Sequence, residues 1–310
     1  MTRAMPREID NVLAKLNWMR RERIWPNGLR YLWTDAFGVI LMVSLRDELG
    51  EERFLGQAEW IVGEVDRVLG RPRGIRIGEE PDRDGQYYHY LAMWLFALWR
   101  LGQIKPEYHD RAVELARTIH PRFIIPGIGV RWKMLEDLSG PYPGFGLGSL
   151  DPFHGMVVYR LLDASALANE IVEMQQLVQQ SYSRLHVAQD LGLGMLLWLA
   201  HFLPREPWAM TMRQRSLATL DRMWIDPPGY FCREPTQPYV KFAFTNYGVS
   251  IGLQAAGTHL DRVEQLNRFF ASYHSGDEYD RNAITHVMAC CSWFPGGLLA
   301  RRPESSPVSQ

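Results

Sequence analysis

The sequence predicts an all-α protein whose helices form a closed double ring, an (α/α)6 toroid of six helical hairpins. Segments that are apolar on every side alternate with segments that carry one apolar face, and this alternation repeats along the 310 residues. A helix that is apolar all round must be buried, whereas a one-faced helix covers a core from outside. Polar groups gather at the N-terminal ends of the buried segments, and only a ring brings six helix ends together. An open solenoid of stacked hairpins is the alternative.

The one-faced segments are expected to form the outer layer. In the first, residues 7–20, five apolar residues recur at helical spacing: Ile9, Val12, Leu13, Leu16 and Met19. The same pattern returns in residues 51–69, 106–119, 164–185, 208–224 and 260–273. We expect residues 7–20 to pack beside the last buried helix and so to close the ring.

The buried segments are expected to form the inner layer. They cover residues 31–45, 87–101, 153–162, 191–203, 242–256 and 283–294. Three long connections rich in Gly or Pro, residues 70–83, 120–149 and 225–241, interrupt the regular spacing and are expected to rim one face. A short strand is expected around residues 130–134. The chain is assigned to one toroid domain, residues 1–300, followed by a disordered Pro- and Ser-rich tail, residues 301–310.

Composition excludes several classes of function. The formal net charge is −1, with charges scattered along the chain, so no basic face for nucleic acid is expected. The three cysteines, Cys232, Cys290 and Cys291, match neither a disulfide framework nor a zinc motif. The N-terminus lacks a signal-peptide core, and the apolar runs are too short to span a bilayer. We expect a cytoplasmic protein that binds a small-molecule substrate and makes no contact with membranes; a homodimer stays open.

This alternation of buried and surface helices, with aromatic and polar groups at the helix mouths, resembles the six-hairpin glycosidase-like superfamily. That group includes unsaturated glucuronyl hydrolases, other glycoside hydrolases and the sugar 2-epimerases. The resemblance covers nearly the whole chain but is one of architecture, without a motif that matches residue for residue. It therefore implies a carbohydrate-active enzyme and carries over no catalytic residue.

Aspartates at the N-terminal ends of the buried helices make a glycoside hydrolase the first predicted function. Hydrolysis of a glycoside needs two carboxyl groups that flank the bond, one of them protonated. Asp35 lies inside an apolar segment, where an ionised carboxylate is costly unless it is paired, and it can act with Asp84 or Asp151. Taken singly, Asp84, Asp151, Asp190 and Asp280 are also explained as helix caps.

Three histidines near the same mouths, His89, His154 and His286, predict a second function. A neutral imidazole near pH 7 is a natural proton shuttle, and a base and an acid on opposite faces of a sugar carbon catalyse epimerisation or isomerisation. A metal site built from His89, His154 and Asp151 is a further alternative, although we expect neither a metal nor a cofactor. The motifs of phosphate loops, nucleophile elbows and zinc proteases are absent from the sequence.

Substrate-binding residues are expected at the helix mouths and in the 120–149 connection. Aromatic rings suit a sugar or an apolar ligand, and cationic side chains suit a carboxylate or phosphate. The expected set comprises Trp33, Gln86, Tyr87, Tyr88, Arg131, Trp132, Lys133, Phe153, Asn246, Tyr247 and Asn282. The aromatic lining is equally compatible with a third function, a toroid that binds or cyclises an apolar terpenoid or polyketide ligand without hydrolysis.

Overall fold

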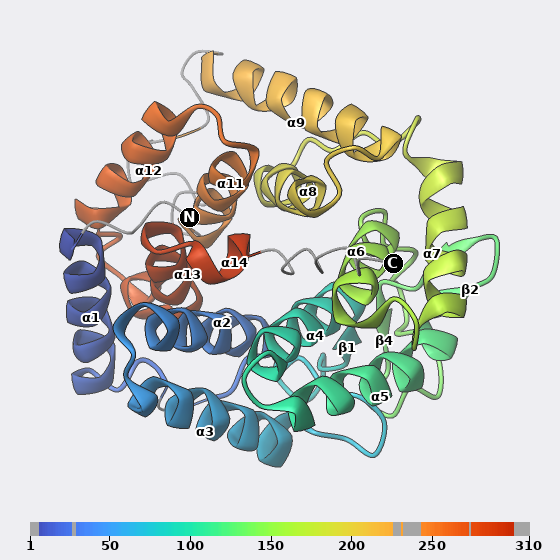
Figure 1. Cartoon of the computed structure of the whole chain (residues 1–310), viewed down its shortest axis with the longest axis horizontal. Helices are drawn as coiled ribbons and strands as arrows, with labels where there is room; N and C mark the ends of the chain where they lie inside the picture. The colour runs from blue at the N-terminus through green and yellow to red at the C-terminus, as the bar shows by residue number, and fades with distance from the viewer. Residues whose placement is uncertain (1–5, 27–28, 226–230, 232–242, 273, 301–310) are drawn as a thin grey trace, which may run out of the picture.

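The computed structural model describes residues 6–26, 29–225, 231, 243–272 and 274–300, and in this part of the chain twelve long helices form two concentric layers (Figure 1). The inner helices are α2 (Leu32–Leu49), α4 (Tyr88–Gly102), α6 (Asp151–Asp163), α8 (Asp190–Phe202), α11 (Ala243–Ala256) and α13 (Ala283–Trp293). The outer helices are α1 (Pro6–Arg21), α3 (Glu52–Leu69), α5 (Pro106–Phe123), α7 (Ala168–Ser181), α9 (Pro207–Ile225) and α12 (Leu260–Ser272). The predicted (α/α)6 toroid is confirmed.

The inner helices have apolar residues on every side because they are buried on every side. Helix α2 is buried without interruption from Leu32 to Leu45, because α3 covers it from outside while α4 and α13 flank it within the inner layer. It ends at Gly50, whose φ of 69° is a backbone conformation that glycine adopts at little cost. The outer helix α3 buries one face only, as its sequence pattern predicts.

Glycines bring helices α8 and α11 into backbone contact. A Cβ atom added at Gly194 would lie 2.3 Å from the carbonyl oxygen of Gly248, and one added at Gly252 would lie 2.3 Å from that of Gly194. Real side chains do not approach backbone atoms this closely. The two helices therefore pack at a separation that only glycine permits.

The ring closes where the first and last inner helices meet. The indole Nε1 of Trp33 in α2 donates to Sδ of Met288 in α13 over 3.4 Å, and the Cys291 thiol donates to the carbonyl oxygen of Phe37 over 3.5 Å. These contacts join residues more than two hundred positions apart. They show a closed ring rather than an open solenoid.

A short helix, α14 (Gly296–Leu299), follows α13 on the inner side of the ring (Figure 1). The Leu298 carbonyl accepts a hydrogen bond of 2.9 Å from Trp198 Nε1, and the Leu299 carbonyl lies 3.0 Å from His201 Nε2; both partners belong to α8. On the other side of the ring, a Cβ atom at Gly297 would lie 1.9 Å from Ser44 Oγ of α2. Helix α14 thus ties α2 to α8 across the ring.

Two small two-stranded antiparallel sheets lie near the N-terminal ends of the inner helices. Strand β1 (Gln86–Tyr87) pairs antiparallel with β4 (Lys133–Met134), and β2 (Ile124–Ile125) pairs antiparallel with β3 (Gly129–Val130). The short strand expected around residues 130–134 is thus two strands, and pairing with β1 brings the 120–149 connection to the start of α4.

Some expectations fall on other parts of the chain. The tail, residues 301–310, Cys232 and nearly all of the 225–241 connection lie outside the described residues. No helix in the described ranges has both the length and the apolar character needed to cross a bilayer.

Candidate active site at the mouth of helices α4 and α6

Adjacent inner helices bring His89, Asp151 and His154 together. His89 lies in the first turn of α4, while Asp151 opens α6 and His154 follows on the same helix. The Nδ1 atom of His89 is 3.7 Å from Oδ1 of Asp151. Asp151 and His154 are buried, whereas the side chain of His89 keeps 23 % of its surface exposed. The arrangement places one reachable imidazole in front of two buried titratable groups.

Several polar atoms of this cluster have no hydrogen-bond partner among the described residues. They are Oδ2 of Asp151 and both ring nitrogens of His154. Oδ2 packs instead against the backbone of Gly148, where an added Cβ atom would lie 1.8 Å away. A buried polar atom without a partner costs about 1–3 kcal/mol, so these atoms are candidates for contact with a bound water or ligand.

Burial favours the neutral form of all three groups. Desolvation, helped by the neighbouring His154, lowers the pKa of His89 to about 3, and desolvation lowers the pKa of His154 to about 4. The same cause raises the pKa of the Asp151 carboxyl well above its ordinary value. Near pH 7 the two imidazoles are therefore neutral and the carboxyl is protonated, so the cluster holds proton acceptors beside a proton donor, and the burial that keeps them neutral also weakens both the bases and the acid.

Aromatic rings surround the partly exposed imidazole of His89. The ring centroid of His89 lies 5.4 Å from that of Tyr87, 5.9 Å from that of Trp33 and 4.7 Å from that of Tyr90. The Trp132 ring stacks toward it at 6.3 Å with an interplanar angle of 25°, and its residue is 40 % exposed. The expected residues Trp33, Tyr87 and Trp132 therefore meet at His89.

Tyr90 was not among the residues expected from the sequence. Its ring is the aromatic neighbour of His89 at 4.7 Å, and its hydroxyl lies 2.6 Å from that of Tyr31. The available signal was its place directly after His89 in the Tyr87–Tyr90 run.

Asp35 lies apart from this cluster. It accepts a hydrogen bond of 2.9 Å from Trp25 Nε1, and its Oδ1 is 3.3 Å from Nη1 of Arg30, with both side chains almost fully buried. The Arg30 guanidinium in turn faces the ring of Trp60 in the outer helix α3. Burial raises the pKa of Asp35 to about 6, although Arg30 and Trp25 act in the opposite direction. The carboxylate thus belongs to a buried ion pair on the outer side of α2.

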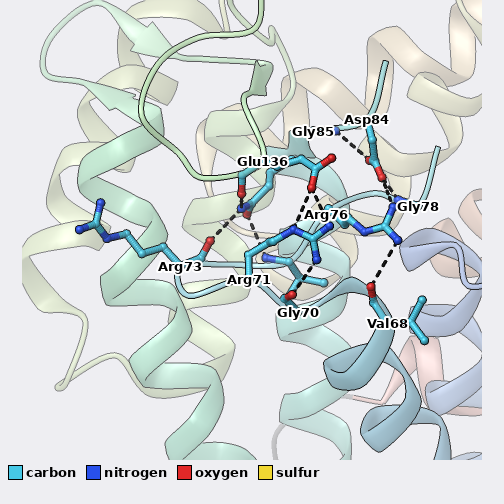
Figure 2. A network of polar contacts seen from close by, with 11 residues as sticks. Val68, Gly70, Arg71, Arg73, Arg76, Gly78, Asp84, Gly85 and Glu136 are labelled. Atoms are coloured by element: carbon cyan, nitrogen blue, oxygen red, sulfur yellow. Dashed lines mark hydrogen bonds and ion pairs between the residues drawn. The ribbon is translucent and has the colours of Figure 1, made fainter. Parts of the chain in front are cut away.

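Asp84 (Figure 2) and Gln86 organise the 70–86 connection. The Asp84 carboxylate pairs with Arg76 and accepts from the backbone N–H of Gly78 and Gly85 at 3.2 and 2.8 Å. The Gln86 amide nitrogen donates to the carbonyl oxygens of Arg73 and Glu136 at 2.8 and 2.7 Å, while its oxygen accepts from the Ile75 N–H at 3.0 Å. These polar groups are used within the protein, and they hold β1 in place so that the next residues reach the site.

The two cations expected to bind a substrate anion are also engaged. Lys133 is buried, donates to Glu79 at 3.0 Å, and faces the rings of Tyr87 and Tyr142 at 4.7 and 4.3 Å. Arg131 donates to the carbonyl oxygen of Arg122 at 2.8 Å. The first contact joins the 120–149 connection to the 70–83 connection, and the second joins it to the last turn of α5.

Three other expected residues contact the outer layer of helices. The Tyr88 hydroxyl donates to that of Tyr159 at 2.8 Å, and its ring packs on Phe123 of the outer layer. The ring of Phe153 packs on Trp208, and that of Tyr247 on Phe270, both in outer helices. These three side chains form the interface between the two layers.

The last expected residues lie on α11 and α13, away from α4. His286 packs edge-on against Trp18 of α1, and its Nε2 is 2.8 Å from the Asp280 carbonyl. Asn282 caps α13 by accepting from the Ile284 N–H, and buried Asn246 lies 3.4 Å from Thr245 Oγ1. The structure does not bring them to His89.

The explanation of aspartates as helix caps is wrong for Asp84 and Asp280 but holds in part for Asp190, whose Oδ1 accepts from the Leu191 N–H at 2.8 Å in the first turn of α8. The capping positions of α6, α8 and α13 belong to Leu150, Gln189 and Asn282, and that of α4 to Tyr87. Asp84 stabilises a loop, and Asp280 accepts from the backbone of Ser275 and Gly276 ahead of its helix. Asp151 and Asp190 are the first residues of their helices, where negative charge is still favoured.

Replacing His154 with glutamine is expected to remove an acid-sensitive contribution to stability. The folded-state pKa of about 4 lies below the ordinary value of 6.5, so below pH 6.5 the unfolded chain binds more protons and the folded state loses stability. At about 1.4 kcal/mol per pH unit, the wild-type free energy of unfolding should fall by about 2 kcal/mol more than that of the variant between pH 7.5 and pH 5. Urea denaturation at both pH values measures this difference.

His186→Gln is the matched control, because His186 is exposed. This variant should keep the wild-type pH dependence. Equal pH dependence in wild type and His154→Gln would contradict the prediction.

Comparison with known proteins bears on the fold. No protein-family model matches the chain, and no curated protein matches it in sequence. Among solved structures, it is similar to a cellobiose 2-epimerase from Bacillus thermoamylovorans B4167, with a TM-score of 0.58 and 10% identity, over 84% of this chain and 87% of that one. It is also similar to a family 76 glycoside hydrolase from a bovine Bacteroides thetaiotaomicron strain, with a TM-score of 0.55 and 14% identity, over 86% of this chain and 70% of that one. The chain therefore has the (α/α)6 toroid fold of these two enzymes.

Proposed function

We propose that the chain is a carbohydrate-active enzyme that moves a proton at a sugar carbon, in the manner of an epimerase or isomerase. The observation that carries this proposal is the His89–Asp151–His154 cluster, in which 3.7 Å separates the imidazole of His89 from the carboxyl of Asp151. Burial favours a neutral base and a protonated acid there. The fold shared with a cellobiose 2-epimerase supports a sugar as the substrate.

The exposure of the three groups suggests their roles. His89 keeps 23 % of its side-chain surface exposed and is assigned to the reacting carbon, where its imidazole accepts the proton next to a sugar carbonyl. Asp151 and His154 are buried behind it and are assigned to proton exchange with His89. The rings of Tyr87 and Trp132 offer flat apolar surfaces for the sugar.

The positions of the carboxylates favour proton transfer over two-carboxylate hydrolysis. Hydrolysis needs two carboxyl groups on either side of one bond. Asp35 is paired with Arg30 and Asp84 with Arg76, so of these three aspartates only Asp151 lies in the cluster.

Deuterium exchange tests the proposal directly. Wild-type protein incubated in D2O with glucose, mannose or cellobiose should exchange the hydrogen on carbon 2 of a reducing sugar, which proton NMR detects as a lost signal. His89→Ala should slow this exchange by about 10²–10⁴-fold, the usual contribution of a general base.

His186→Ala, at an exposed position, is the control and should exchange at the wild-type rate. Cleavage of cellobiose without exchange would contradict the proposal in favour of hydrolysis. Activity on no sugar, with tight binding of a terpenoid, would contradict it in favour of an apolar-ligand toroid.

A further inference from the structure

A groove of about 710 Å³ lies between the outer helices α1 and α12, over the end of α13. We call it the seam groove, because the first and last outer helices of the ring meet there; its lining includes Lys15, Trp18, Gln254, Asn267, Ser292 and Trp293. None of these residues belongs to α4 or α6, so the groove is separate from the His89 cluster. Its volume lies in the range typical of small-molecule sites, roughly 300–1,000 Å³.

An unpaired cation lies between two indoles in the seam groove. Lys15 Nζ is 4.8 Å from the ring centroid of Trp18 and 5.9 Å from that of Trp293. No ion pair joins Lys15 to a carboxylate in the ranges that the structure describes, and burial lowers its pKa. An ammonium group that has lost part of its water and has no counter-charge favours an anionic ligand.

The other charges that line the groove leave Lys15 uncompensated. Glu264 pairs with Arg268 one turn along α12. Glu8 precedes Lys15 by two turns of α1, about 10 Å along the helix axis, and is exposed. An incoming carboxylate would therefore find its nearest free positive charge at Lys15.

A fixed set of amide groups lies beside the two indoles. Asn267 Oδ1 accepts from Ser292 Oγ at 2.8 Å and from Ser250 Oγ at 3.3 Å, and Gln254 Nε2 donates to the Ser292 carbonyl at 2.9 Å. In the described chain, these bonds leave Asn267 Nδ2 free to donate and Gln254 Oε1 free to accept. Donors and acceptors held in this way suit the hydroxyl groups of a ligand.

We propose that the seam groove is a binding site for an acidic sugar, such as a uronic acid. Its carboxylate would pair with Lys15, its ring would lie on the indole of Trp293, and its hydroxyls would bond to Asn267 and Gln254. An indole offers the flat apolar surface that the C–H face of a sugar ring requires. The inference rests on the proposed function only in the choice of a sugar as the ligand.

Calorimetric titration of the full chain with D-glucuronate and with D-glucose, at constant ionic strength, tests this site. Wild type should bind glucuronate more tightly than glucose. Lys15→Gln should weaken glucuronate binding about tenfold, as expected for the loss of one charge-assisted hydrogen bond, and should leave glucose binding unchanged. Trp293→Ala should weaken the binding of both sugars.

Two further variants locate the ligand. Lys105→Gln removes a lysine with a 40 % exposed side chain and should leave the affinity unchanged, which controls for net charge. His89→Ala should also bind glucuronate normally. Glucuronate binding that is absent in wild type, or that survives both Lys15→Gln and Trp293→Ala, would overturn the seam site. Binding lost only in His89→Ala would place the ligand at the α4–α6 mouth, which overturns the seam site and leaves the proposed function standing.

Discussion

Gly252→Ala should destabilise the protein by about 2–3 kcal/mol, and Gly252→Leu should destabilise it further. The new Cβ atom would lie 2.3 Å from the carbonyl oxygen of Gly194 and 2.6 Å from its Cα, so helices α8 and α11 would have to separate. Forcing extra atoms into a packed contact costs about 1–3 kcal/mol and occasionally more. Urea denaturation of the two variants and wild type measures the change in the free energy of unfolding.

Gly56→Ala is the matched control. Gly56 lies within the outer helix α3, and no heavy atom of the surrounding residues comes within 4 Å of the position of its Cβ. Alanine is the better helix former by about 0.5–1 kcal/mol, so this variant should be slightly more stable than wild type. If the two alanine variants changed stability in the same direction, the close contact between α8 and α11 would not be limiting.

Asp35→Ala is expected to cost about 3–5 kcal/mol in the free energy of unfolding. The change leaves the Arg30 guanidinium, whose side chain is 2% exposed, without its carboxylate in a buried site. The double variant Arg30→Met with Asp35→Leu should recover most of the loss, because it removes both charges at similar volume. Thermal and urea denaturation at pH 7.5 compare the three proteins.

Asp66→Ala serves as the control for this pair, because the side chain of Asp66 is 41% exposed and that of its partner Arg111 is 43% exposed. Exposed pairs contribute about 0–1 kcal/mol, so this variant should stay close to wild type. If Asp35→Ala abolished sugar chemistry while the protein kept its stability, Asp35 would have a catalytic role and paired-carboxylate hydrolysis would be favoured.

The architecture could be predicted because the burial of a helix determines how apolar residues are spaced in its sequence. The all-apolar stretch 31–45 became α2, and the one-faced stretch 51–69 became α3, each within a few residues of the expected bounds. Helix α14 was not predicted, because four residues are too short to show a periodic pattern. The sequence does contain an indication of the close contact between α8 and α11. Gly248 and Gly252 lie one helical turn apart, on the same face of α11.

The site could be predicted only in part, because the sequence shows which polar residues are buried but does not show their partners. Asp35 was correctly recognised as a costly buried carboxylate, yet Arg30 and Trp25 reach it from the turn that precedes α2. Gln86 was expected to face a ligand, but backbone groups from residues 73, 75 and 136 use its whole amide. These contacts depend on the conformation of the loops, which the spacing of apolar and polar residues does not predict.

Helix α14 also constrains when the ring can be completed during synthesis. Its residues, together with Met288 and Cys291, supply contacts to α2, which leaves the ribosome more than two hundred residues earlier. Until the last hairpin has left the ribosome, Trp33 and Phe37 of α2 have no partner from α13, and Ser44 has none from α14. Contacts between such distant residues form late, since a long loop must close first. A chain without its last hairpin would therefore expose the apolar side chains of α2 that α13 covers in the folded ring, and such surface is the kind that chaperones shield.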